Sequence, residues 1–318
     1  MIAAVLTHPR TIKLQKVSLP TLKSNEVKIK VRGCGICSSS LPLWEGREWF
    51  KYPCEPGSPG HEGWGIVEAI GEEVSIVKTG DYVSFLSYHA YAEYDIAGEN
   101  NLIKLPLELH DQPFPGEPLG CAMNIFYRAC ISANDTVAII GSGFLGTLLC
   151  QLVKSSGAKL IVISKRRYSL EMARKFGADE TFSLTNTPEL INQIAEITNN
   201  NFCTRVIEAT GKQEGIDLAT EIIAESGKII IAGYHQDGMR QVNLQKWNWK
   251  GIDVINAHER DPKRYLSGMQ KAINAVIKGI ITPQLLYTHM LPIDQLNNGF
   301  ALTSTRPDGF MKAIVGEW

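Results

Sequence analysis

The stretch TVAIIGSGFLGTLLCQLV, residues 136–153, decides the fold of this chain. Its first five residues are apolar and largely β-branched, which predicts a buried strand over 136–140. Gly141-Ser142-Gly143-Phe144-Leu145-Gly146 follows, and the leucines beyond it are spaced as on one face of a helix. The three glycines permit a tight turn, the approach of a pyrophosphate to the backbone, and close packing of helix on strand. This setting favours a dinucleotide-binding turn over a turn that binds no ligand.

Downstream of this motif, the sequence alternates between strand and helix patterns. Helical periodicity appears at 168–177 and 216–227. Alternating strands and helices predict a parallel sheet with helices on both faces. The strands of this sheet are predicted at 136–140, 159–164, 180–184, 204–210, 228–233 and 253–258.

The N-terminal and C-terminal parts of the chain lack this alternation of strands and helices. The first ~120 residues read as short strands separated by turn signals, which predicts a barrel-like β segment. The C-terminal part is mixed, and we expect it to pack on the N-terminal part because alone it is too small for a core. The N-terminal strands are predicted at 2–7, 26–35, 63–71, 81–88 and 92–98, and the C-terminal elements at 264–279 (helix), 285–291 (strand), 294–302 (helix) and 311–318 (strand).

Composition excludes several classes of protein. With 318 residues, two domains are expected. Lys+Arg 32 against Asp+Glu 33 leaves a net charge of −1, which argues against a nucleic-acid partner. Seven cysteines, an odd number, are typical of reduced thiols and not of a disulfide framework. No signal peptide is evident, and the uncharged stretch 136–153 holds three glycines, so no membrane association and a cytoplasmic location are expected.

The end of the second predicted strand bears on the choice of cofactor. An NAD site places Asp or Glu about 20 residues after the first glycine, where it binds the ribose 2′-hydroxyl. Here the strand ends at Ser164 and continues into Lys165-Arg166-Arg167. A hydroxyl followed by three cations suits a 2′-phosphate, so NADP(H) is predicted. The alternative is a solvated basic turn before a helix.

Four residues of metal-binding type are predicted to lie in one domain: Cys37, His61, Glu62 and Cys121. Thiolate, imidazole and carboxylate ligands suit a tetrahedral zinc ion with one position open to substrate. Each residue also has a structural alternative, a cysteine as a small buried apolar side chain or a histidine in a turn. Spacing alone leaves both interpretations open.

Three motifs together resemble a known family. Gly35-Ile36-Cys37-Ser38-Ser39, Gly60-His61-Glu62-Gly63-Trp64-Gly65 and Glu117-Pro118-Leu119-Gly120-Cys121 precede the glycine turn in the order seen in zinc-dependent medium-chain dehydrogenases/reductases, the alcohol and polyol dehydrogenases. The resemblance covers essentially the whole chain. It implies an α/β protein with a GroES-like β-barrel catalytic domain, residues 1–127 and 265–318, and a doubly wound parallel Rossmann domain, residues 128–264.

The same resemblance implies roles for individual residues. Cys37, His61 and Cys121 would hold one catalytic zinc, with Glu62 as a fourth or intermittent ligand. Ser39 would pass the proton of the substrate hydroxyl. The predicted cofactor contacts are Gly141, Gly143, Phe144, Leu145, Gly146, Ser164, Lys165, Arg166, Arg167, Thr210 and Lys312.

The chain departs from the family pattern at three places. No cysteine stands between Ser87 and Tyr91, so the lobe that carries a structural zinc in relatives is absent and no second zinc is expected. Ser40 replaces an acidic residue that orients the histidine ligand, which could weaken zinc binding. Pro42 replaces a relay histidine, so another group or water must complete the proton transfer.

The predicted function is therefore an NADP(H)- and zinc-dependent alcohol dehydrogenase or carbonyl reductase, acting on an alcohol, aldehyde or ketone. One alternative is a zinc-independent reductase of the same fold that acts on an activated C=C or C=N bond. Another is a non-catalytic NADPH-binding protein. The resemblance also implies a homodimer joined through an edge of the Rossmann sheet, with 253–258 as the candidate edge strand. Aromatic residues between the first two motifs either line a substrate pocket or pack the domain: Trp44, Trp49, Phe50 and Tyr52.

Overall fold

The computed structural model describes residues 1–316 and divides the chain into two compact units. The first comprises residues 1–120, 261–277 and 282–318, of which 317 and 318 lie outside the described residues. The second comprises residues 121–260 and 278–281. From the sequence, the first domain was predicted to give way to the second after residue 127 and to resume at residue 265. In the structure, the corresponding changes from one unit to the other fall after residues 120 and 260.

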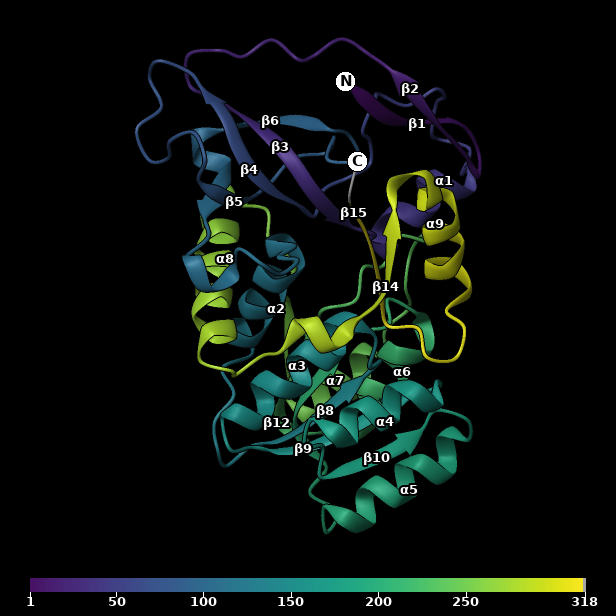
Figure 1. The fold of residues 1–318 in the computed structure, drawn as a ribbon. Coiled ribbons are helices and arrows are strands. Elements are labelled where there is room, and N and C mark those ends of the chain that lie inside the picture. The colour runs from purple at the N-terminus through teal and green to yellow at the C-terminus, as the bar shows by residue number, and fades with distance from the viewer. Residues whose placement is uncertain (317–318) are drawn as a thin grey trace. The chain divides into compact units, whose positions relative to one another are not determined.

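The second unit is built on a six-stranded parallel sheet in the order β10-β9-β8-β11-β12-β13 (Figure 1). This is the strand order 3-2-1-4-5-6 of a doubly wound dinucleotide-binding fold, so the predicted α/β architecture is confirmed. The strands are β8 (Thr136–Ile140), β9 (Lys159–Ser164), β10 (Glu180–Ser183), β11 (Cys203–Glu208), β12 (Ile223–Ile231) and β13 (Asp253–Asn256). The last of these stands at an edge of the sheet, as predicted.

Helices of the second unit pack on this sheet. Apolar residues of the strands and helices form a core, in which the central strands β8 and β11 are almost fully buried. Burial on both faces explains why these strands read as unbroken apolar runs. The helices are α3 (Phe144–Ser155), α4 (Arg167–Lys175), α5 (Thr187–Ile197), α6 (Gln213–Ile222) and α7 (Leu244–Lys250).

One predicted helix is wrong at its end. The pattern predicted a helix over 216–227, but α6 ends at Ile222 and β12 starts at Ile223 without a connecting loop. Ile223 is β-branched and fully buried, its backbone is extended, and it pairs with Cys203 of β11. Pairing with the neighbouring strand therefore overrides the helical spacing of the apolar residues.

The first unit is built on a mostly antiparallel seven-stranded sheet, with β6 (Tyr94–Gly98) paired beside β3. The order of the other strands is β14-β15-β3-β4-β5-β7 (Figure 1). The C-terminal strands therefore share a sheet with the N-terminal ones, as the sequence predicted. These strands are β3 (Glu26–Gly35), β4 (Gly63–Ile70), β5 (Tyr82–Phe85), β7 (Leu102–Lys104), β14 (Tyr287–Pro292) and β15 (Lys312–Gly316), and a separate hairpin joins β1 (Ile2–His8) and β2 (Thr11–Lys16).

Three helices belong to the first unit: α1 (Leu41–Glu45), α8 (Pro262–Ile277) and α9 (Leu296–Thr305). A fourth helix, α2 (Gly116–Ala129), crosses the division between the units at 120/121. The short helical turn η1 (Ser38–Ser40) directly follows Cys37. None of the helices in the described part of the chain is long and apolar enough to cross a membrane.

Candidate functional site: a metal-binding group and a dinucleotide turn

A group of potential metal ligands forms in the first unit where two turns meet. Cys37 follows β3 and precedes η1, and His61 and Glu62 directly precede β4. Because β3 and β4 pair antiparallel, with Cys34 opposite Gly63, these turns lie at the same edge of the sheet. Each of the three residues Cys37, His61 and Glu62 offers one potential ligand atom, and these three atoms lie within 4.8 Å of one another. Within residues 1–316, this is the one such group of cysteine, histidine and acidic side chains.

The environment of His61 fixes the orientation of its ring. Nδ1 lies 3.0 Å from the carbonyl oxygen of Pro59, so Nδ1–H donates and Nε2 is left to face Cys37. Burial alone would lower the pKa of His61, but the hydrogen bond and charge of Cys37, with the charges of Glu117 and Glu62, raise it to about 10. A backbone acceptor on the second ring nitrogen is typical of histidines that bind metals.

Glu62 is fully buried and forms an ion pair with Lys312 of β15. The Lys312 ammonium lies 2.7 Å from Oε1 and 2.5 Å from Oε2. Burial would lower the pKa of Lys312, but the charges of Glu62 and Cys37, the hydrogen bond to Glu62 and the charge of Glu117 raise it. The prediction that Lys312 reaches a cofactor phosphate receives no support from this placement, because its ammonium faces Glu62.

The backbone around Glu62 is closely packed. A Cβ atom at Gly35 would lie 1.8 Å from Glu62 Oε2, so only glycine fits beside this carboxylate. A buried oxygen donor therefore lies beside half-buried sulfur and nitrogen donors, and the donor set suits a zinc ion. Cys121, the fourth predicted ligand, is the first residue of the second unit, and its part in the site remains a prediction.

The two serines after Cys37 have different partners. Ser39 Oγ donates a hydrogen bond to the sulfur of Cys37 at 3.1 Å. Ser40 is buried, at 5% exposure, and Pro42 lies buried in α1. The hydroxyl of Ser39 is therefore in direct contact with one of the potential metal ligands, as its predicted role requires.

The aromatic residues after Cys37 separate into two kinds. Trp44 is buried, stacks on Phe300 at 5.8 Å, and donates a hydrogen bond to Asn297 at 3.0 Å. Trp49, in contrast, is 65% exposed and is not packed inside the domain. Tyr52 donates a hydrogen bond to the carbonyl of Leu43. Packing of the domain is therefore the role of Trp44 and Tyr52.

An aromatic neighbour of the metal group was missed in the sequence. The ring of Tyr88 lies 5.9 Å from the ring of His61, and Tyr88 is 66% exposed. It stands in the short connection between β5 and β6. Nothing in the local pattern of residues indicates this contact, because the two residues are brought together by the sheet.

In the second unit, the glycine turn has the geometry that the motif predicts. Gly141 has φ +96, a conformation that side chains disfavour. A Cβ at Gly146 would lie 2.0 Å from the carbonyl oxygen of Gly141, so the helix packs as closely as expected. Phe144 and Leu145 open α3, whose N-terminus supplies free N–H groups suited to phosphates.

The three cations after Ser164 have distinct surroundings. Lys165 pairs with Glu214 at 2.7 Å, and Arg167 lies 3.7 Å from Glu171. Arg166 extends toward the glycine turn, since its Nη2 would lie 3.9 Å from a Cβ at Gly143. The Ser164 hydroxyl is buried and accepts a long hydrogen bond, 3.5 Å, from the backbone N–H of Arg166.

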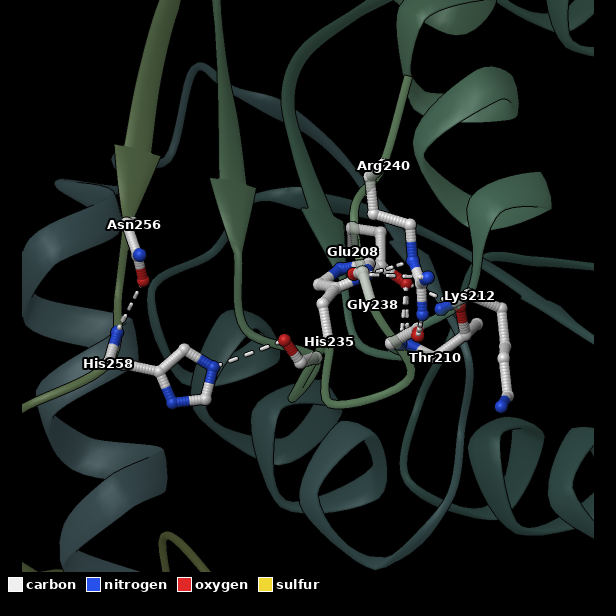
Figure 2. Close-up of polar contacts among 10 residues, drawn as sticks. Glu208, Thr210, Lys212, His235, Gly238, Arg240, Asn256 and His258 are labelled. Carbon is white, nitrogen blue, oxygen red and sulfur yellow. Dashed lines mark hydrogen bonds and ion pairs between the residues drawn. The ribbon is translucent and has the colours of Figure 1, made fainter. Parts of the chain in front are cut away.

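A buried carboxylate holds the turn that contains Thr210. Glu208, the last residue of β11, accepts hydrogen bonds from the N–H and the hydroxyl of Thr210 and from the N–H of Gly211 at 3.0 Å (Figure 2). Gly141 and Thr210 are in close contact, because a Cβ at Gly141 would lie 2.8 Å from Thr210 Cγ2. The hydroxyl of Thr210 thus faces Glu208, which the prediction of a cofactor contact did not anticipate.

The same carboxylate reaches the loop after β12. His235 Nε2 lies 2.8 Å from Glu208 Oε2, and Arg240 Nε donates to His235 Nδ1 at 3.1 Å (Figure 2). Arg240 also donates to the carbonyl of Gly211 at 3.0 Å. This Glu208–His235–Arg240 network was missed, although an acidic residue ending a buried apolar strand is a signal for it. Nearby, His258 Nε2 lies 3.1 Å from the carbonyl oxygen of Gly233 (Figure 2).

Comparison with known proteins agrees with the geometry. Residues 23–124 match the family described as alcohol dehydrogenase GroES-like domain, and residues 145–275 match the zinc-binding dehydrogenase family. A D-arabitol-phosphate dehydrogenase of Enterococcus avium is 26% identical over 89% of this chain and 88% of its own. A quinone oxidoreductase of Sus scrofa is 31% identical over 77% of this chain and 75% of its own.

Solved structures share the fold over nearly the whole chain. An alcohol dehydrogenase from Escherichia coli complexed with NADH has a TM-score of 0.84 at 23% identity, covering 100% of this chain and 99% of its own. A zinc-binding dehydrogenase from Sinorhizobium meliloti bound to NADP has a TM-score of 0.84 at 22% identity and covers 99% of both chains. The fold is thus found in one protein complexed with NADH and in another bound to NADP.

Proposed function

This chain belongs to the zinc-binding medium-chain alcohol dehydrogenase family, and from that premise we propose that it transfers a hydride between NADP(H) and an alcohol or carbonyl substrate. The observation that carries the proposal is the group formed by Cys37, His61 and Glu62, with the hydroxyl of Ser39 on the sulfur of Cys37. A structural role alone would not require a thiol, an imidazole and a carboxylate within 4.8 Å.

Cys37 and His61 would hold a zinc ion, with Glu62 as an intermittent ligand and Cys121 as a further one. Zinc bound there supplies Lewis acidity toward a C–O bond, and the nicotinamide cofactor supplies the redox chemistry. The carbonyl of Pro59 accepts from Nδ1 of His61, so Nε2 is the nitrogen that would give up its proton and bind a metal. Lys312 forms an ion pair with Glu62 and so compensates the charge of this buried side chain.

Ser39 is the group proposed to accept or return the substrate's hydroxyl proton. Its Oγ is both a donor and an acceptor, so it can take a proton from one partner while giving its own to another. Pro42 offers no proton, so solvent or a group outside α1 completes the transfer. Tyr88, exposed beside His61, provides an apolar ring face next to the same group.

The preference for NADP(H) over NAD(H) is supported by the end of β9. No carboxylate follows Ser164 in the turn, and Arg166 extends toward Gly143, where the motif expects phosphate. Lys165 and Arg167 face Glu214 and Glu171. Because its guanidinium extends toward Gly143, Arg166 is the residue proposed to bind the 2′-phosphate. The backbone of Thr210, beside Gly141, is proposed to adjoin the cofactor.

A homodimer is proposed through β13. Val254 on this edge strand is 41% exposed, and Trp249 of the preceding helix α7 is 82% exposed. An uncovered edge with exposed apolar side chains is suited to pairing with a second copy.

A second candidate function is the zinc-independent reduction of an activated C=C or C=N bond. The 31% identity to a quinone oxidoreductase favours it, and so does the ion pair that occupies Glu62. A non-catalytic NADPH-binding protein is the third candidate.

Metal analysis separates the first two functions. Protein purified without chelators is expected to hold about one zinc per chain, and Cys37→Ala or His61→Ala is expected to lose it while still binding NADPH. Cys130→Ser, at an exposed cysteine outside the group, is the matched control. A zinc content near zero would favour the second function, and turnover of any alcohol with NADP⁺ excludes the third.

A further inference from the structure

Asp95 of β6 is a buried carboxylate that lies outside the metal group. It is 5% exposed and is paired with Ile29 of β3. Burial raises the pKa of Asp95, while hydrogen bonds from Ser87 and Ile96 and the charge of His89 lower it in part. A buried carboxylate is unfavourable unless hydrogen bonds satisfy its oxygens, so the donors around Asp95 indicate what it holds in place.

These donors fix the start of the connection between β5 and β6. Oδ1 of Asp95 accepts from the N–H of Ile96 at 2.7 Å, and Oδ2 accepts from the hydroxyl of Ser87. The oxygen of that hydroxyl accepts in turn from the N–H of His89 at 2.8 Å. His89 Nε2 also lies 2.9 Å from Oε2 of Glu55, but the Glu55 side chain is 81% exposed, so this contact contributes little. Ser87 is therefore the link between the buried carboxylate and the backbone of the connection.

The same connection is bound to residues 57–60. The N–H of Ala90 donates to the carbonyl of Gly60 at 3.0 Å. A Cβ atom at Gly57 would lie 2.1 Å from the carbonyl oxygen of His89, so the two backbones are in direct contact. A displacement of His89 would therefore displace residues 57–60 as well.

Residues 57–60 carry the acceptor that orients a potential metal ligand. The carbonyl oxygen of Pro59 lies 3.0 Å from Nδ1 of His61. A partner on the second ring nitrogen fixes the orientation of a metal-binding histidine, and its loss typically weakens metal binding by roughly tenfold to a hundredfold. Because this acceptor belongs to the backbone, its position depends on the contacts that hold residues 57–60.

We propose that Ser87, anchored on Asp95, is a positioning residue for His61 and thereby sets the affinity of the metal group for zinc. The inference rests on the proposed function, because it takes zinc as the ion that the metal group binds. The path runs from the carboxylate through the Ser87 hydroxyl to the backbone of His89, and from there to the carbonyl of Pro59. Every contact on this path lies within the first unit.

Three substitutions of Ser87 vary the strength of this link. Ser87→Ala removes the hydroxyl, Ser87→Cys replaces it with a weaker donor, and Ser87→Thr keeps it. Ser75→Ala is the matched control, because the Ser75 hydroxyl also donates to a carboxylate, that of Glu99, at 3.1 Å. Ser75 follows the end of β4 opposite to His61, so loss of its hydroxyl is expected to leave the metal group undisturbed.

The first measurement is the zinc affinity of each protein, by competition with a chromogenic chelator. Ser87→Ala is expected to bind zinc roughly tenfold to a hundredfold more weakly than the wild type, and Ser87→Cys is expected to lose less. Ser87→Thr and Ser75→Ala are expected to bind zinc as the wild type does.

The second measurement is hydrogen exchange of the metal-free proteins. The N–H of Ala90 donates to Gly60 in the wild type, and it is expected to exchange faster in Ser87→Ala than in the wild type or in Ser75→Ala. This measurement follows the link from Ser87 to residues 57–60 without requiring a metal or a substrate.

The proposal is overturned if a folded Ser87→Ala protein binds zinc within twofold of the wild type, even with a lowered melting temperature, because the role of Ser87 would then be structural only. If Ser87→Ala does not fold, Ser87→Cys is judged by the same limit. An equal loss in Ser87→Thr or in Ser75→Ala would also overturn it, because the loss would then not follow the hydroxyl of Ser87.

Failure of this inference differs from failure of the proposed function. A wild type that binds no zinc refutes the proposed function and this inference together. A wild type that binds zinc, with Ser87→Ala equal to it, refutes this inference alone.

Discussion

The ammonium of Lys312 lies 2.7 Å from Oε1 of Glu62, and both side chains are buried. The two residues are 250 positions apart in the sequence. Lys312 begins β15, and Glu62 lies in the turn before β4 of the same sheet. Because an unpaired charge in such a position is strongly unfavourable, each of the two side chains compensates the charge of the other. The charge of Glu62 is thereby balanced before any metal binds.

Removing Lys312 is expected to destabilise the first unit. Lys312→Met leaves Glu62 charged and uncompensated, which should cost about 3–5 kcal/mol in urea denaturation. The double variant Glu62→Gln, Lys312→Met removes both charges and should recover most of that loss. Equal stabilities of the two variants would show that the ion pair contributes little.

The same pair makes stability depend on alkaline pH. The pKa of Lys312 is raised in the folded protein, so its contribution is complete below the pKa of an unfolded lysine, 10.5, and is lost as pH rises through the higher folded value. The wild type should therefore lose more stability than Lys312→Met between about pH 9 and pH 12. Parallel curves for the two proteins over this range would contradict the assignment.

Ser39→Ala is expected to lower kcat by roughly 10²–10⁴, the range for a positioned acid–base group. The alternative role of Ser39 is local, in holding the turn after Cys37 through its 3.1 Å bond to the sulfur. A structural loss would lower the melting temperature and leave kcat nearly unchanged. Ser38→Ala, one position earlier, is the matched hydroxyl deletion.

Arg166→Ala should weaken NADPH by roughly tenfold to a hundredfold and leave NADH nearly unchanged. Lys165→Ala and Arg167→Ala serve as controls, since those cations face Glu214 and Glu171. Ser164→Asp should reverse the preference, because a carboxylate repels a 2′-phosphate and binds ribose hydroxyls. A wild type that binds NADH more tightly than NADPH would refute the assignment.

Breaking the Glu208–His235–Arg240 network should loosen the loops after β11 and β12. Glu208→Ala leaves the N–H groups of Thr210 and Gly211 without their acceptor, at a cost of about 1–3 kcal/mol for each buried group. His235→Ala should cost less, since it removes one of the bonds to the carboxylate. Hydrogen exchange at Thr210 and Gly211 measures the effect, and unchanged protection in Glu208→Ala would contradict it.

Local patterns predicted those parts of the structure that local interactions determine. The turn from Gly141 to Gly146 follows from a strand, three glycines and a helix adjacent in sequence, and the structure has that geometry. The helix predicted over 216–227 is correct up to Ile222 and wrong beyond it, because Ile223 pairs with Cys203, which is distant in the sequence. Contacts between distant residues, such as Glu208 with His235 or Arg306 with Ser38, leave no periodic signal.

The metal ligands are an intermediate case. Cys37, His61 and Glu62 were recognised through family motifs, and the structure brings their ligand atoms together. Spacing alone could not have shown this, because the pairing of β3 with β4 is what places the two turns at one edge. Lys312, the partner of Glu62, was predicted to contact the cofactor, because nothing near Lys312 in the sequence indicates that it pairs with a buried carboxylate.

The strand that carries Lys312 has a consequence for the order in which the protein folds as it is synthesised. β15 pairs with β3, so Ile314 meets Gly35 only after every residue of the second unit has been made. The second unit draws its sheet from one nearly continuous segment and can form first. Until then β3 can pair with β4 and β6, but Gly33–Gly35 lack the strand that β15 supplies and Glu62 lacks its cation.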